Sequence, residues 1–264
     1  MKINIHNTTY IFVLLSFLSG YFEYVYLFLL IIFIHESGHY IFSKIVNFKY
    51  SEIVIYPFGG ITNYNEDLNV SVNKELFTLI GGITFQLCFV YLIFILYKNN
   101  YVTYHTYNII NNINKLLVSY NFLPILPLDG GKLLNIILDK IFPYKLSFKI
   151  SIVISIIFTI IFLLSKRTYL GLLLTIFLIK CIILEINNLK YKYNKFLLER
   201  YLNDYNFKRT RIINNINDLK RDNYHIINNM LEKKYLKKIF DISYVKWYYI
   251  TKESYIWKQL IQKH

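Results

Sequence analysis

The feature that most constrains this chain is a series of long apolar runs within its first 186 residues. A helix needs roughly 20 mostly apolar residues to cross a bilayer, and several of these runs reach or approach that length. Of all residues, 55% are hydrophobic and only 17% charged, whereas a soluble domain would have more charge and fewer long apolar runs. The pattern predicts an all-α polytopic membrane protein. About six spans are predicted, near residues 9–22, 24–45, 75–97, 109–126, 146–164 and 169–186.

Six crossings would place both termini on the same side of the membrane, and the basic residues indicate which side. Residues 187–264 hold 17 of the 30 Lys and Arg but only 7 of the 16 Asp and Glu, a net charge of +10. Because cytosolic segments carry the excess of Lys and Arg, both termini are predicted to be cytosolic. The first run could pass for a signal peptide, but another apolar helix follows almost at once, which favours a retained span. The chain thus divides into a membrane domain, 1–186, and a small basic cytosolic domain, 187–264.

The second apolar run contains the motif His35-Glu36-Ser37-Gly38-His39. On a helix, residues four apart share a face, so both imidazoles can reach one metal ion. Glu36 lies beside them, where a general base for a water molecule is needed. A hydrogen-bonded histidine pair in a helix bundle is the alternative for the two imidazoles. Glu36 has no comparable structural role, because an unpaired carboxylate at membrane depth is costly.

A third metal ligand is needed, since a catalytic zinc site usually has three protein ligands and a water. Asp129 is the best candidate. At about 1.5 Å per residue, His35 lies roughly 16 Å beyond Tyr24 and Asp129 roughly 21 Å beyond Lys115, which are comparable depths. Pro124 and Pro127 break the helix before Asp129, and the glycine pair after it frees the chain to turn. The alternative role for Asp129 is the N-cap of a helix over residues 131–141.

Residues 50–65 are too polar and too broken for a helix. A strand is predicted over residues 52–56, followed by a turn over 57–62 in which Gly59 and Gly60 permit unusual backbone angles. One interpretation is an ordinary surface hairpin. The other is a re-entrant hairpin that dips toward the active site and offers its edge to an extended peptide. In the tail, helices are predicted over 195–202 and 226–239 and a strand over 244–250.

The motifs resemble those of the site-2 protease family of intramembrane zinc metalloproteases. His-Glu-x-x-His lies in one span, Asn-x-x-Pro-x-x-Pro-x-Asp-Gly begins at residue 121 in a later one, and the Gly-Gly hairpin lies between them. The resemblance covers roughly residues 10–186. It implies a Zn²⁺ cofactor and the following site residues: His35, His39 and Asp129 as metal ligands, Glu36 as the catalytic base, and Asn121, Phe58, Gly59 and Gly60 as substrate contacts.

The six-span layout with a cytosolic tail also resembles the stage IV sporulation protease of endospore formers. This implies a membrane-associated substrate such as a pro-sigma factor, a membrane-protein inhibitor, and a location in the mother-cell membrane around the forespore. The excess of Ile, Asn, Lys, Tyr and Phe is typical of a low-GC bacterium. Residues 187–264 lack the length and the Gly and Pro turns of the nucleotide-binding domain that this branch usually carries, so ATP sensing is not predicted.

Two other classes of function remain open. A different membrane-embedded zincin, such as a prenyl-protein protease, would take a glutamate as third ligand, and Glu185 is the only candidate near the later spans. A metal transporter would need polar residues in the fifth and sixth spans, and a non-catalytic scaffold would normally have lost Glu36 or a ligand. For the basic tail, contact with the anionic lipid bilayer is favoured over substrate recognition. Nucleic-acid binding is not expected, because no motif beyond charge supports it.

Overall fold

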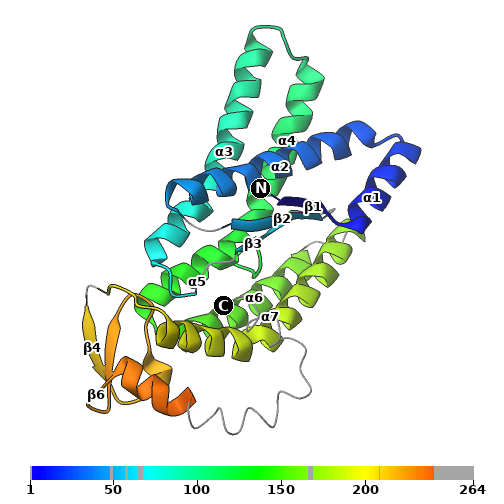
Figure 1. Ribbon diagram of the computed structural model, residues 1–264. Coiled ribbons are helices and arrows are strands. Elements are labelled where there is room, and N and C mark those ends of the chain that lie inside the picture. The colour runs from blue at the N-terminus through cyan, green and yellow to red at the C-terminus, as the bar shows by residue number, and fades with distance from the viewer. Residues whose placement is uncertain are drawn as a thin grey trace.

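The structure is a computed structural model that describes residues 2–47, 50–56, 59–64, 68–165, 169–207 and 209–240. Helices dominate it, and two small sheets accompany them (Figure 1). The helices are α1 (Asn7–Leu18), α2 (Phe22–Ile45), α3 (Val72–Lys98), α4 (Tyr104–Asn121), α5 (Asp129–Ile141), α6 (Tyr144–Ser165) and α7 (Tyr169–Leu202). The strands are β1 (Lys2–Ile5), β2 (Tyr50–Tyr56), β3 (Gly59–Tyr64), β4 (Thr210–Ile213), β5 (Tyr224–Ile227) and β6 (Met230–Leu231).

Among the described residues, α2, α3, α6 and α7 are long and apolar enough to cross a membrane. Helix α1 is apolar but has only 12 residues, and α4 has five asparagines among its 18 residues. The six-span layout and the cytosolic termini therefore stay predictions. The assignment to an all-α class holds for the spanning part, to which the structure adds two three-stranded sheets.

Helix α6 has the polar-in, apolar-out pattern of a helix in lipid. Ser147, Ser151, Ser155 and Thr159 are spaced four apart and buried, and the last three donate to the carbonyl one turn earlier. The Ser155 hydroxyl also accepts a hydrogen bond from the Leu126 amide at 2.9 Å. Large apolar side chains cover the exposed face instead: Val153, Ile156, Ile157, Ile160 and Ile161. Small hydroxyl residues at helix contacts and apolar residues outside are typical of membrane bundles.

The N-terminal sheet confirms a hairpin between α2 and α3. β2 pairs with β3 in antiparallel fashion, and Tyr56 lies opposite Gly59. The turn predicted over residues 57–62 extended too far, because β3 already begins at Gly59, and residues 57 and 58 lie outside the described residues. The unusual backbone angle predicted for Gly59 is confirmed, since its φ is +158°. β1 adds in parallel to the other side of β2, so the order is β1-β2-β3 and β3 is an edge strand. The sheet packs against α2 (Figure 1).

Helices α2 and α3 cross at a glycine contact. A Cβ atom on Gly38 would lie 2.3 Å from the Gly81 carbonyl oxygen, and one on Gly81 would lie 2.7 Å from the Gly38 oxygen. Without side chains the two backbones approach closely, as small residues allow in membrane helices. The histidine-bearing helix is therefore in direct backbone contact with α3.

The break between α4 and α5 places the third predicted ligand. α4 ends at Asn121, as the prolines indicate, so the predicted span 109–126 extended too far. α5 begins at Asp129, two residues earlier than predicted. Gly130 and Gly131 do not turn the chain, since they belong to α5 and are not among the glycines of positive φ. They instead allow the preceding segment to pack on α5, because added Cβ atoms would lie within 2.5 Å of its backbone.

Residues 209–240, here named the C-terminal unit, pack on the end of α7 and the start of α6 (Figure 1). α7 continues unbroken through the predicted boundary at residue 186, which confirms the helix over 195–202. The predicted helix over 226–239 was partly wrong, since only residues 232–240 are helical. Before them, Asn228 and Asn229 have positive φ and join β5 to β6, as the turn of a tight hairpin requires. The strand predicted over 244–250 lies outside the described residues.

Candidate metal centre and active site

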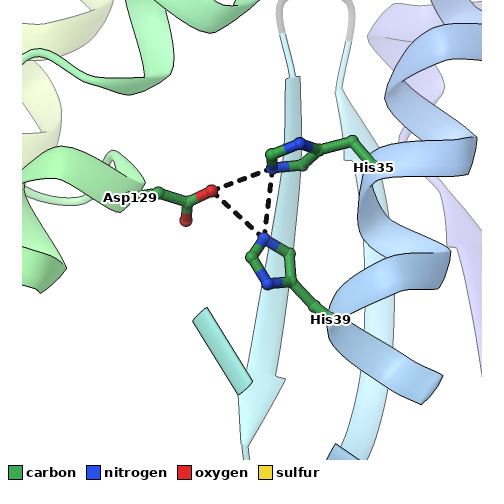
Figure 2. Close-up of side chains that lie close together, drawn as sticks. All are labelled: His35, His39 and Asp129. Carbon is green, nitrogen blue, oxygen red and sulfur yellow. Dashed lines mark hydrogen bonds and ion pairs between the residues drawn. The ribbon is translucent and has the colours of Figure 1, made fainter. Parts of the chain in front are cut away.

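The structure brings the two histidines and the aspartate together (Figure 2). His35 Nε2 lies 2.9 Å from Asp129 Oδ2, His39 Nε2 lies 3.1 Å from the same oxygen, and the two nitrogens are 3.1 Å apart. All three residues are buried. Atoms spaced in this way can all lie about 2.0–2.1 Å from one common point, which is the bonding distance of zinc. Within the described part of the chain, this group could hold a metal ion.

The outer nitrogens of both imidazoles fix which nitrogen faces the aspartate. His39 Nδ1 donates to the Thr78 carbonyl oxygen at 3.0 Å, because a carbonyl can only accept. His35 Nδ1 lies 2.8 Å from Gln86 Oε1, and Gln86 Nε2 in turn donates to Asn114 Oδ1 at 2.8 Å. In this arrangement both Nε2 atoms of the neutral imidazoles carry lone pairs. Two lone pairs and a carboxylate oxygen in mutual contact are best satisfied by a cation among them, so the donor set fits a metal ion.

Asp129 uses its second oxygen differently. Oδ1 accepts from Lys132 Nζ at 3.2 Å, which leaves Oδ2 for the imidazoles. The N-cap alternative for Asp129 was wrong. α5 begins at Asp129 itself, and Leu128 at the N-cap position makes no side-chain capping bond. A carboxylate in the first turn also suits the helix dipole.

Glu36 lines the same cavity as two of the three candidate metal ligands, His35 and Asp129. The cavity has a volume of about 50 Å³, and its lining includes Glu36, His35, Asp129 and Asn121. A water molecule needs about 10–15 Å³ measured in this way, so the cavity has room for one. Glu36 is 5% exposed, and its Oε2 has no hydrogen-bond partner among the described residues. A buried carboxylate oxygen without a partner, on a residue that lines a cavity with room for a water, is well placed to bind one.

Residues that the sequence did not single out complete the surroundings of the histidines. Gly82 gives the imidazoles room, because a Cβ atom there would lie 2.4 Å from His39 Nε2. Gln86 is one turn further along α3 and fully buried. The signal was present, since Gly82 and Gln86 are four apart and therefore share a face of an otherwise apolar helix. Asn114 joins them only through a tertiary contact, whereas Lys132 lies one turn after Asp129 on the same helix.

The structure describes three of the four predicted substrate contacts: Gly59, Gly60 and Asn121. Gly59 and Asn121 line the cavity with Glu36. Gly60 lies in β3, opposite Ile55, and Phe58 lies outside the described residues. Their contact with substrate stays a prediction. Glu185, the alternative third ligand, accepts from Lys192 Nζ at 2.5 Å and does not belong to the metal-binding group.

Comparison with known proteins finds a peptidase family to which part of this chain is similar. Residues 23–105, which contain both histidines, match the model of Peptidase family M50. This match covers less than half of the chain, and together with the similar proteins described below it confirms the resemblance to site-2 proteases. Four helices of the described residues are long and apolar enough to cross a bilayer, which indicates an integral membrane protein.

Two curated relatives and one solved structure are similar. Stage IV sporulation protein FB of Bacillus subtilis is 29% identical over 145 residues, which cover 55% of this chain and 50% of the relative. A zinc metalloprotease of Methanocaldococcus jannaschii is 28% identical over 156 residues, 54% of this chain and 44% of the relative. The chain thus spans about half the length of the curated relatives it matches. The structure of a site-2 protease from Methanocaldococcus jannaschii has the same fold, with a TM-score of 0.57 and 23% identity over 69% of this chain and 89% of that one.

Proposed function

We propose that this protein is an intramembrane zinc metalloprotease that hydrolyses a peptide bond of a membrane-associated protein. The observation that carries the proposal is the convergence of His35, His39 and Asp129 on one point, with Glu36 in the same cavity. Both histidines lie in α2, a helix long and apolar enough to span the membrane. The match to Peptidase family M50 supports the same reaction class.

Each residue of the site has a role in this proposal. Zinc held by the three ligands supplies a Lewis acid that polarises the scissile carbonyl and lowers the pKa of a water. Glu36 takes the proton of the attacking water, because its carboxylate faces the cavity next to the ligands. Asn121 lines the same cavity and donates a hydrogen bond to the substrate backbone or to the developing oxyanion.

The proposed substrate enters as an extended strand. A transmembrane helix shields its carbonyls by hydrogen bonding, so a substrate helix must unwind before it can be cut. β3 is an edge strand that begins at Gly59, and Gly59 lines the catalytic cavity. Strand addition to β3 would replace the helical hydrogen bonds that unwinding breaks.

A narrower proposal concerns the biological substrate. Similarity to Stage IV sporulation protein FB supports processing of a pro-sigma factor at the mother-cell membrane around the forespore, under the control of a membrane-protein inhibitor. In this proposal both termini are cytosolic, and the basic residues after α7 contact anionic lipid. The cavity, not the sporulation context, carries the enzymatic proposal.

The test is co-expression with a candidate pro-sigma factor, with its shortened product detected by size. The wild-type chain is expected to give the product, and Glu36→Gln is expected to abolish it while retaining zinc. Glu23→Gln is a matched control, because it makes the same chemical change at an exposed position on the same helix. Cleavage by Glu36→Gln at the wild-type rate would remove the proposed base. A zinc-loaded chain that leaves this substrate intact would refute the narrower proposal.

A further inference from the structure

Residues 219–222 of the C-terminal unit, here named the coupling segment, bond to the ends of three helices of the membrane domain. The first amides and last carbonyls of a helix lack partners within the helix and need them from elsewhere. The coupling segment supplies such partners to the start of α3, the end of α5 and the start of α6. The bonds are from the Val72 amide to Asp222, from the Lys220 ammonium to the Ile141 carbonyl, and from the Tyr144 amide to the Leu219 carbonyl.

Arg221, in the middle of the coupling segment, joins two of these helices by ion pairs. Its Nη1 lies 2.7 Å from Glu75 Oε2 in the first turn of α3 and 2.9 Å from Asp139 Oδ2 near the end of α5. Its Nη2 donates to the Val70 carbonyl at 3.0 Å. The Arg221 side chain is 5% exposed and that of Asp139 is fully buried. Burial alone would lower the pKa of Arg221, but the two carboxylates raise it above its ordinary value, so the guanidinium stays charged.

The coupling segment is itself held in place from α7. Arg200 Nη2 donates to the carbonyl oxygens of Lys220, Arg221 and Asn223 at 2.9, 2.6 and 3.0 Å. Its Nη1 pairs with Glu232 at 2.8 Å, and its Nε donates to Asn69 just before α3. The guanidinium of Arg221 is therefore presented to α3 and α5 on a braced backbone.

Both helices that Arg221 joins contribute to the metal site: α5 carries Asp129, and α3 packs against the histidines of α2. Asp139 lies ten residues after Asp129 on the single helix α5, so a shift at one end moves the ligand at the other. Glu75 lies one turn before Thr78, whose carbonyl orients His39. The ligand atoms are only 2.9–3.1 Å apart and come from α2 and α5. Their spacing thus depends on how α5 sits against α2 and α3.

We propose that Arg221 is a positioning residue for the metal centre: it fixes α5 against α3, so that Asp129 reaches the two histidines. The inference rests on the proposed function, since it requires a metal ion at this site. The proposal gives the C-terminal unit a role in forming the metal site. A change in the unit would then alter metal coordination without touching a ligand.

The test measures metal coordination in the purified full-length chain. Cobalt(II) replaces zinc in such sites and reports the coordination geometry through its visible absorption, and zinc affinity follows from competition with a chelating dye. Arg221→Gln is expected to change the cobalt spectrum and to weaken zinc binding roughly tenfold, the lower end for residues that support metal ligands. Arg221→Lys keeps the charge but lacks the second nitrogen that donates to the Val70 carbonyl, so its zinc affinity should fall between those of the wild type and Arg221→Gln. Arg211→Gln is the control, because Arg211 is exposed in β4 of the same unit.

A second variant covers the case in which Arg221→Gln does not fold. Asp139→Asn weakens the contact of Arg221 to α5 and leaves Glu75 as a partner for Arg221, while the amide oxygen can still accept from Ser147. It is expected to change the cobalt spectrum in the same direction. Lys233→Gln breaks the ion pair between the C-terminal unit and Asp204, which follows α7, and should leave the cobalt spectrum unchanged.

The outcomes separate the two proposals. A wild-type chain that binds neither cobalt nor zinc overturns the proposed function. If the wild-type chain binds the metals but folded Arg221→Gln has the same spectrum and zinc affinity, only the proposed role of Arg221 is overturned. Where Arg221→Gln is unfolded, an unchanged spectrum in Asp139→Asn overturns that role.

Discussion

The substitution Gln86→Leu tests whether the polar chain behind His35 supports the metal centre. Gln86 is fully buried and links His35 on α2 to Asn114 on α4 through two hydrogen bonds of 2.8 Å. Leucine has a similar volume but neither an acceptor nor a donor. The substitution leaves His35 Nδ1–H and Asn114 Oδ1 without these partners, and it frees the His35 ring to rotate.

The loss of stability and the loss of metal affinity can each be given a magnitude. A buried polar group that loses its partner costs about 1–3 kcal/mol, so two groups cost roughly 2–6 kcal/mol before the added apolar contacts offset part of the loss. Loss of a residue that orients a ligand weakens metal binding about 10–100-fold, which corresponds to about 1.4–2.8 kcal/mol. We therefore expect a lower melting temperature and a zinc affinity reduced by at least about tenfold.

The assay is a zinc competition titration beside a thermal melt, both in detergent. Gln86→Glu separates the two effects, because a carboxylate still accepts from His35 Nδ1 and should retain zinc affinity. Thr84→Val is the matched control, since Thr84 is half-buried on the same helix and its hydroxyl donates to the Ile80 carbonyl, away from the metal site. A Gln86→Leu chain that binds zinc as tightly as the wild type would refute the supporting role.

Two further predictions concern other parts of the chain. Gly82→Ala should abolish zinc binding and proteolysis while leaving the chain in the membrane, because its Cβ atom would lie 2.4 Å from His39 Nε2; full zinc content measured by atomic absorption would contradict this. The pKa of Glu232 is lowered from 4.5, since the hydrogen bond from His225 and other neighbours outweigh burial, which raises it. Its stabilising contribution is complete above pH 4.5 and is lost as the pH falls through the lowered value, so limited proteolysis should release the C-terminal unit only in acid. Release near neutral pH would show that another group controls the attachment.

The metal ligands could be predicted from sequence because each leaves a local signal. His35 and His39 are four apart on an apolar helix, and their shared face follows from helix geometry alone. Asp129 stands out as an acidic residue directly after two prolines at membrane depth. Gln86 leaves only the helix face that it shares with Gly82, and Arg221 leaves no local signal, because their partners are 51 and 82 residues away and become neighbours only through helix packing.

The errors in secondary structure have a similar cause. β1 has only four residues and pairs with β2, 50 residues later in the chain, so no local pattern distinguishes it. The predicted helix over 226–239 had a suitable apolar spacing, but Asn228 and Asn229 adopt positive φ, which asparagine tolerates, and begin a hairpin there. Strand propensity depends on the partner strand more than helix propensity depends on its neighbours.

The site depends on specific contacts that fix how the helices are aligned with one another. Apolar packing in lipid does not fix this alignment well. Lipid is as apolar as leucine, so close approach of small residues and buried hydrogen bonds decide how membrane helices align. Gly38 and Gly81 set α2 against α3, and Gln86 sets α3 against both α2 and α4. At the cytosolic end that we propose, Arg221 sets α3 against α5 through charges buried in protein. Each of these contacts involves a helix that carries a metal ligand or a helix that packs against one. Substitutions at these contacts should therefore disturb metal coordination before they disturb insertion into the membrane.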